Sequence, residues 1–315
     1  MISPIKTVLG IMLLVSAVAA LGSDNNGIVM VNEQTMDMLI TGANVAQMSD
    51  INANLMGNDI LANQATVLMI EDGCLTGLDD GRTNAIQVAD LMINDIGSTN
   101  IDTQFGALYQ DENNIAIGNI TQVTGMEADD IGCGNSIDQS SSSSAGNFFG
   151  FIEPNMLTNS DLGQASILNA CVDGSANNAV QGIDQFITYN TLTDSEIYEQ
   201  AKINANILGN ENNPAIGSQG VFQNVDSNLL TGSSASQVIC LDEQSTGCFN
   251  DVSQLARPYF YDNALTSSTS LQSIDLEAAA MGAENVLDQN ADLLSSDNNA
   301  VVGHLVQITD IINNS

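Results

Sequence analysis

Apolar and polar residues alternate along much of the chain, in short runs separated by corners rich in Asn, Gly, Asp and Ser. In the run NNIAIG from Asn113, alternation would give a strand one buried face and one wet face. Asn, Gly and Asp tolerate tight turns, whereas Ile, Val and Thr favour pleated surfaces. The pattern predicts a mostly β fold, with strands of about five residues joined by Asn-rich corners.

Two segments carry a different pattern. DSEIYEQAKINANIL at 194–208 and SIDLEAAAMGAENVLDQNADLL at 273–294 place Ala, Glu and Leu at spacings that suit a helix. We therefore expect one or two short helices among the strands.

One polar string returns several times. NNAVQGIDQ at 177–185 has variants that begin at Asn113, Asn212 and Asn298. Within the first copy, the turn and strand preferences place Asn177 and Asn178 at a corner and lead Ala179 and Val180 into a strand. Gly182 would then allow a close approach of backbones, and Gln185 would be available for stacking.

Asn and Gln at corresponding positions of such repeats can stack as ladders, because each side-chain amide donates to one layer and accepts from another. The predicted ladder residues are Asn114, Gln122, Asn178, Gln185, Asn213, Gln223, Asn299 and Gln307. The alternative is an ordinary β-sandwich with an Asn-rich surface. The NN cores lie 64, 35 and 86 residues apart (177 − 113, 212 − 177 and 298 − 212), which is too irregular for a strict solenoid with a fixed rung. The expected fold is thus an irregular, repeat-containing β-sheet, solenoid-like or sandwich-like.

The repeats also predict an organisation in two halves. INANLMGN at 51–58 returns as INANILGN at 203–210, an offset of 152 residues (203 − 51). Between the copies lies the low-complexity stretch SSSSSAGNFFG at 140–150, which predicts a flexible polar loop. We therefore expect two β-rich halves with degenerate repeats, 23–139 and 151–315, on either side of this loop.

The N-terminal segment resembles a secretory signal. Lys6 precedes an uncharged apolar run from Val8 to Leu21, which has small residues near its end at Ala17 and Ala19 and is followed by Gly22. The run is shorter than the roughly 20 residues of a spanning helix, so a cleaved signal peptide over 1–22 is predicted, with a retained anchor as the alternative. The mature chain is expected outside the cell, without a membrane segment.

The charge balance excludes several classes of partner. Asp and Glu number 38 against 4 Lys and Arg, which gives a formal net charge of −34. Such a field repels nucleic acid and anionic lipid surfaces and attracts cations. Because few carboxylates can find a basic partner, ion pairs cannot hold the fold together, and packing and backbone ladders must do so.

Five cysteines and one histidine limit the chemistry of the chain. An exported protein can form disulfides, and Cys240 and Cys248 delimit a short loop that a bridge could close. Zinc is disfavoured because there is no CxxC pair and His304 is the single histidine. His304 lies in an apolar stretch that predicts a strand, and the sequence has no nucleophile elbow, phosphate loop or HExxH motif. An enzyme is therefore not expected.

Adjacent carboxylates are the remaining candidate sites. The pairs Asp79 with Asp80 and Asp129 with Asp130 could offer hard oxygens to calcium, although neither matches a known calcium loop and solvated loops are the alternative. No other cofactor is expected. Asn119 begins an Asn-Ile-Thr sequon that could carry a glycan.

GSANNAVQGIDQ at 174–185 resembles the repeats of curli-type extracellular amyloid subunits, although here the repeats are neither equal in length nor contiguous. The signal-like leader, acidic balance, Asn/Ala/Ile-rich body and scattered cysteines resemble, over most of the chain, the sheath proteins of filamentous methanogenic archaea. That resemblance implies a tubular, extracellular, amyloid-like casing of β-rich subunits that resists detergent and protease.

The sequence thus predicts a secreted structural subunit that assembles with itself, by pairing of strand edges, into a cell-surface sheath or filament. Other cell-envelope proteins are further candidate partners. The alternative is a secreted calcium-dependent adhesion domain, or a binding domain associated with the S-layer, that does not polymerise.

Overall fold

The computed structural model describes the backbone of most of the chain. The described residues are 10–21, 27–41, 45–56, 59, 61–76, 83–110, 114–116, 118–146, 156–159, 161–209, 218–248, 250–283, 286–296, 298–301 and 304–314.

One wall of the molecule is a nine-stranded parallel sheet, called sheet A. Its strands, in spatial order, are β1 (Gly10–Leu21), β3 (Val45–Met56), β5 (Thr83–Ile96), β8 (Gly118–Ile131), β11 (Asp161–Asp173), β14 (Glu196–Leu208), β17 (Ser234–Thr246), β20 (Thr269–Met281) and β24 (His304–Asn314). The spatial order follows the chain order, so each turn of the chain adds one strand to the sheet.

The opposite wall belongs to a fifteen-stranded parallel sheet, called sheet B. Its long strands are β2 (Gly27–Thr41), β4 (Leu61–Thr76), β6 (Ile101–Gln110), β9 (Ser136–Gly146), β12 (Asn178–Thr188), β15 (Ser218–Asp226), β18 (Asp251–Tyr261) and β21 (Val286–Ala291), and β22 (Leu294–Ser296) also pairs with β18. A narrow row of short strands continues the sheet around a corner: β7 (Asn114–Ala116), β10 (Met156–Thr158), β13 (Thr191–Thr193), β16 (Leu229–Thr231), β19 (Ala264–Thr266) and β23 (Asn299–Val301).

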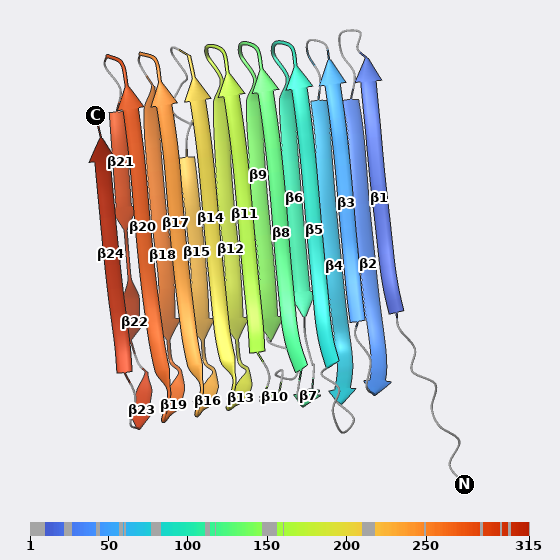
Figure 1. Ribbon diagram of the computed structural model, residues 1–315, viewed down its shortest axis with the longest axis vertical. Helices are drawn as coiled ribbons and strands as arrows, with labels where there is room; N and C mark the ends of the chain where they lie inside the picture. The colour runs from blue at the N-terminus through green and yellow to red at the C-terminus, as the bar shows by residue number, and fades with distance from the viewer. Residues whose placement is uncertain are drawn as a thin grey trace.

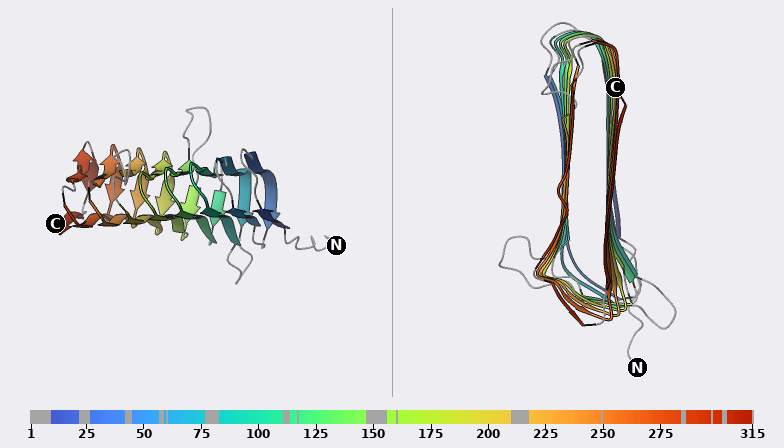
Figure 2. Two further views of the ribbon diagram at one scale, coloured as in Figure 1. Left: turned by 90° about the horizontal axis from the view of Figure 1, so that it is seen from above. Right: turned by 90° about the vertical axis from the view of Figure 1, so that its left-hand side faces the viewer.

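The chain therefore winds as a β-solenoid. Figure 1 shows the strands stacked side by side from the N-terminal to the C-terminal end, and the end-on view of Figure 2 shows two long walls joined by turns. The predicted mostly β, solenoid-like fold is confirmed, and the sandwich alternative is excluded because the strands are parallel and follow chain order.

The two predicted helices are wrong, since the described residues contain no helix. Both segments are strands: the first forms β14, and the second forms β20 and part of the opposite wall. In β20, buried residues alternate with more exposed ones over its whole length. This period of two buries Leu276, Ala278 and Ala280, and the burial outweighs the weak helix preference of Ala, Glu and Leu.

Aliphatic side chains form columns inside the walls. The Ile51 position of sheet A continues through paired strands as Leu91, Met126, Leu168, Ile203, Leu241 and Leu276, all buried. The predicted internal copies at 51 and 203 thus occupy one column. Ile183, Val221 and Ala256 of sheet B pack into the same cluster.

The irregular spacing of the repeats does not disrupt the solenoid. The residue aligned with Gln110 is Ala145, 35 residues on, whereas the residue aligned with Asn114 is Met156, 42 residues on. The seven additional residues (42 − 35) therefore lie between β9 and β10. Because insertions fall between strands, the rungs vary in length while the sheets stay in register.

The predicted Ser-rich loop is partly wrong. Ser140–Ser144 belong to β9, which pairs with β6 on one side and β12 on the other. Ser141, Ser143 and Ser144 are buried, and Ser141 Oγ lies 3.1 Å from Ser166 Oγ of the opposite wall, where a small side chain leaves room for the facing sheet. Residues 147–150 lie outside the description, and sheet B is continuous through the predicted boundary between halves.

A column of glycines shapes one corner of five consecutive rungs. Gly132, Gly174, Gly209, Gly247 and Gly282 have φ between +136° and +155°, which side chains rarely adopt. The N–H groups of the first four bond to carbonyls of the following rung, as in Gly132 N–H to Asp173 O at 2.8 Å. The corner residues are therefore hydrogen-bonded from rung to rung, as the residues of the parallel strands are.

The predicted signal peptide overlaps β1, the edge strand of sheet A, which pairs in parallel with β3. No helix among the described residues is long and apolar enough to cross a membrane. Cleavage at about residue 22 stays a prediction.

Candidate functional site

A ladder of glutamine amides runs through the inside of sheet A. The Nε2 of each glutamine donates to the Oε1 of the glutamine one rung before it, at 2.7–2.9 Å. Its members are Gln47, Gln87, Gln122, Gln164, Gln237, Gln272 and Gln307, with one acid, Glu199, between Gln164 and Gln237. The bonds all point toward the N-terminal end, so the ladder has a direction.

A second ladder runs through sheet B with the same direction. Its bonds measure 2.8–3.4 Å and join Gln64, Gln104, Gln139, Gln181, Gln219, Gln254 and Gln289. Both ladders also bridge the walls: Gln122 donates to the Ser144 carbonyl at 3.2 Å, and Gln139 donates to the Asn169 carbonyl at 3.0 Å. Each amide thus binds a neighbouring rung and the opposite wall. At about 1 kcal/mol for each hydrogen bond, the ladders are a substantial source of stability.

Asparagines stack at two corners. Asn135 N–H donates to Asn177 Oδ1 at 2.9 Å, and Asn100 N–H donates to Asn135 Oδ1 at 2.9 Å. At another corner, Asn190, Asn228, Asn263 and Asn298 form an equivalent column with main-chain to side-chain distances of 2.8–3.0 Å. The NN strings at 177 and 298 therefore serve different corners.

Several predicted ladder residues lie in stacked columns of glutamine amides. Gln122 and Gln307 are members of the sheet A ladder, and Gln223 Nε2 donates to Gln185 Oε1 at 2.8 Å in a further short column of sheet B. The expected close approach at Gly182 is wrong, since nothing lies within 4 Å of where its Cβ would be.

The predicted asparagines were misplaced by one residue. Asn177 and Asn298 stack, whereas Asn178 only approaches Ser136 Oγ at 3.5 Å and Asn299 is exposed. In these two strings, the first Asn is at the corner and the second begins the strand, so its side chain points in a different direction. The side chain of Asn114 and all of Asn213 lie outside the description.

Sequence reasoning missed most of the two long ladders because it followed the NN strings. A signal was present: Gln87 and Gln122 are 35 residues apart, as are Gln237, Gln272 and Gln307. The intervals of 38, 40 and 42 elsewhere, as between Gln181 and Gln219, hid this period.

Glu199 interrupts the sheet A ladder. It is fully buried in β14, where its Oε2 accepts from Gln237 Nε2 at 2.9 Å. Its Oε1 and the Oε1 of Gln164 have no hydrogen-bond partner. Burial raises the pKa of Glu199 to about 8, with a smaller opposing effect of Gln237. The protonated acid could donate to Gln164, whereas the carboxylate leaves two acceptors facing each other.

Replacing Glu199 with Gln is therefore expected to stabilise the fold. The new Nε2 would donate to Gln164 Oε1 as in every other rung, which removes an unsatisfied buried acceptor worth about 1–3 kcal/mol. Urea unfolding at pH 8 should show this gain in the free energy of unfolding, and the gain should shrink at pH 4. Glu196→Gln, an exposed change in the same strand, is the control and should shift stability by under about 0.5 kcal/mol. Equal effects of the two variants would contradict the proposed ladder gap.

Three buried aspartates gather at the corner after the N-terminal strands of sheet A. Asp95 and Asp130 are paired neighbours on β5 and β8, and Asp102 lies on β6. All three are at most 2% exposed. Burial raises the pKa of Asp95 to about 6, of Asp130 to about 7 and of Asp102 to about 8, and their mutual repulsion adds to the shifts of Asp102 and Asp130. Asn135 donates to Asp130 Oδ1 and partly offsets its shift.

The predicted calcium residues do not come together. Asp130 is buried whereas its neighbour Asp129 lies on the outer face, because successive residues of a strand point to opposite sides. Asp79 and Asp80 lie outside the described residues. Within the described part of the chain, no group of three or more His, Cys, Asp and Glu is close enough to hold a metal ion.

The predicted bridge between Cys240 and Cys248 is not formed: neither residue is in a disulfide, and Cys248 Sγ accepts from the Ala283 N–H at 3.4 Å. Cys133 and Cys171 form no disulfide either. Cys240 lies within β17 and Cys248 follows its end. The intervening extended strand, at about 3.3 Å per residue, keeps the two thiols far apart. Burial raises the pKa of the Cys171 and Cys240 thiols, helped by nearby carboxylates, so their reactive thiolate forms are disfavoured. His304 begins β24 as the sequence predicts, and its side chain lies outside the description.

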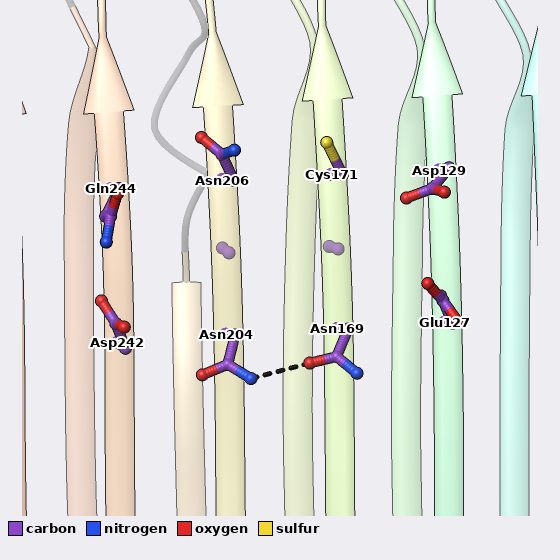
Figure 3. Close-up of a pocket in the computed structure, with 10 residues that line it drawn as sticks. Glu127, Asp129, Asn169, Cys171, Asn204, Asn206, Asp242 and Gln244 are labelled. Atoms are coloured by element: carbon purple, nitrogen blue, oxygen red, sulfur yellow. Dashed lines mark hydrogen bonds between the residues drawn. The ribbon is translucent and has the colours of Figure 1, made fainter.

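The outer face of sheet A carries rows of acids and amides. A hollow of about 310 Å³ on this face is lined by Glu127, Asp129, Cys171, Asp242 and several amides. Figure 3 shows how these side chains lie along the strands. Asn204 Nδ2 donates to Asn169 Oδ1 at 2.7 Å across this face. The side chains stand in rows because the strands are in register, and the pocket is the space between adjacent rows.

No protein-family model matches the chain, and neither a curated protein nor a solved structure matches it. A functional proposal therefore rests on the fold and on these ladders.

Proposed function

We propose that the chain is a secreted structural subunit that assembles with itself, by strand-edge pairing, into a cell-surface sheath or filament. The observation that carries this proposal is the open end of the solenoid at β24. There, sheet A and its amide ladder stop at an edge that is unpaired among the described residues. An unpaired edge is a template for another strand.

The side chains of β24 support this proposal. Ile311, at an inner position of β24, is 47% exposed, whereas its partner Leu276 in β20 is buried. Val306, Ile308 and Ile312, at outer positions of the same strand, are 39–52% exposed. Terminal repeats of solenoids normally carry a polar cap that prevents stacking. The exposed aliphatic residues of β24 favour association at this end.

The interior supports a structural role as well. Two long ladders of amides that also bridge the walls resemble the side-chain stacking that stabilises fibrous β assemblies. Sheath formation and the extracellular location are inferred from these features together with the predicted signal peptide and the acidic composition.

The mature chain, residues 23–315, is expected to polymerise when its charge is neutralised. With a net charge of −34 for the whole chain, subunits should repel each other at neutral pH and low salt, and calcium or acid should remove that barrier. Light scattering and negative-stain electron microscopy should show filaments or sheets at high protein concentration with millimolar calcium or at about pH 4.

Replacing calcium with magnesium or sodium at matched ionic strength distinguishes general screening of the negative charge from specific binding of calcium. Protein that stays monomeric under all these conditions and binds no amyloid dye would overturn the proposed assembly. Monomer that binds calcium tightly would instead support the alternative adhesion domain.

A further inference from the structure

The two ends of the solenoid have complementary shapes once the predicted signal peptide is removed. At the C-terminal end, sheet A extends to β24 while sheet B ends at β21, β22 and β23, so sheet A is half a rung longer. At the N-terminal end without β1, sheet B begins with β2 and sheet A begins with β3. Because the chain runs from β2 to β3, sheet B is then half a rung longer at this end.

We propose that β24 of one copy takes the place of β1 against β3 of the next copy, while β2 of that copy covers the β21–β23 edge of the first. This inference rests on the proposed self-assembly and names its junction. The β24 strand of one subunit and β2 of the next would together form one complete rung. With β1 in place, sheet A would gain an extra strand at the junction and sheet B would be left with a gap.

The registers of the two strands favour β24 over β1 at this position. In the columns of sheet A, Gln307 aligns with the ladder position of Gln47, and Ile311 aligns with the apolar position of Ile51. The strand β1 brings Met12 and Ser16 to those two columns. At the junction, β24 would therefore continue both the ladder and the apolar column, and β1 continues neither.

The direction of the ladder makes the junction head-to-tail. Gln307 Nε2 already donates to Gln272 Oε1 at 2.7 Å, so its Oε1 faces the open end. As in the glutamine-to-glutamine bonds of the ladder, the Nε2 of Gln47 in the next copy would donate to the Oε1 of Gln307. If two C-terminal ends met instead, the Oε1 atoms of two Gln307 side chains would face each other, and neither atom can donate a hydrogen bond. A repeated head-to-tail contact that does not close produces an open filament. In sheet B, the second copy places Met30 in the column of Gln289, so the amide ladder continues in sheet A alone.

The outer face at the junction explains a requirement for cations or acid. The column of Asp275 and Asp310 in one copy would meet the column of Asp50 and Asp90 in the next. The carboxylates of each neighbouring pair, on strands about 4.8 Å apart, repel each other. Repulsion between Asp50 and Asp90 already contributes to the raised pKa of Asp90. A row of four carboxylates should therefore delay joining until protons or cations reduce its charge.

Cross-linking tests the junction. In a mature chain with its five cysteines changed to Ser, one preparation carries Met48→Cys and a second carries Ile308→Cys, both at exposed outer positions that the junction would align. Under mild oxidation in assembly conditions, the mixture should give covalent dimers and each preparation alone should give none. An out-of-register pair, Met48→Cys mixed with Ile312→Cys, is the matched control and should not cross-link.

The outcomes separate this junction from assembly itself. Filaments without the 48–308 cross-link, or 308–308 dimers from one preparation alone, would overturn the junction and leave self-assembly intact. A complete absence of polymer would overturn the proposed function. The full chain, with β1 in place, should give at least tenfold less 48–308 product than the mature chain, and equal yields would show that β24 does not replace β1.

Discussion

Replacing Gly174 with Ala is expected to prevent the chain from closing its solenoid at that corner. Gly174 has φ +145°, and an added Cβ would lie 1.7 Å from the Gly132 carbonyl oxygen of the preceding rung. Backbone strain alone costs about 1–3 kcal/mol, and the overlap with a backbone atom cannot be relieved by rotating a side chain. We expect a loss of more than about 3 kcal/mol in the free energy of unfolding, measured by urea denaturation with far-UV circular dichroism.

Gly163→Ala is the matched control for that substitution. Gly163 lies in β11 of the same rung, and nothing occupies the 4 Å around its Cβ position. Its replacement should leave stability unchanged or raise it by under about 1 kcal/mol, since alanine restricts the unfolded chain. If both variants unfolded at the same urea concentration, the stacked glycine corner would not be a determinant of the fold.

The fold should lose stability as pH rises from about 4 to about 8, in contrast to most globular proteins. In the unfolded chain, Asp102 and Glu199 lose their protons near pH 4, but burial raises both folded pKa values to about 8. Between these values the folded state holds protons that the unfolded state has released. The free energy of unfolding therefore falls with rising pH, by several kcal/mol in all at about 1.36 kcal/mol for each pKa unit.

Variants distinguish these buried acids from the general repulsion of a highly charged chain. Asp102→Asn should flatten the slope of stability against pH between pH 5 and 8, because a neutral amide no longer loses a proton there. Asp129→Asn, on the outer face of β8, removes one charge and should leave that slope nearly unchanged. Salt should weaken the repulsion between exposed groups far more than the effect of buried ones. A slope that salt abolishes and Asp102→Asn leaves intact would contradict the role of the buried acids.

Much of the fold could be predicted from local pattern. Alternation in runs such as NNIAIG indicated strands, and the INAN copies at 51 and 203 occupy the same column of sheet A. The two segments predicted as helices show where this reasoning fails. Alanine and glutamate carry a weak preference that the packing of β20 between neighbours outweighs, and that packing is invisible in a single segment.

The candidate site was only partly predictable. Gln122 and Gln307 were identified, but the partner of Gln122 depends on an alignment across 42 residues to Gln164 and across 35 residues to Gln87. Nor does the sequence show that Glu199 occupies a glutamine position of the ladder. That position is known only once the strands are aligned, because the rungs differ in length. The adjacent acids Asp129 and Asp130 illustrate the same limit: neighbours in sequence, they lie on opposite sides of one wall.

The sequence by itself determined the strand-forming alternation, the polar corners and the negative charge, since these depend on residue type and near neighbours. The tertiary structure alone decided which amides stack, which acids are buried and which edges remain open. The physical reason is that a parallel solenoid places residues 35–42 positions apart in contact, and a single added residue within a strand would turn every later side chain to the other face.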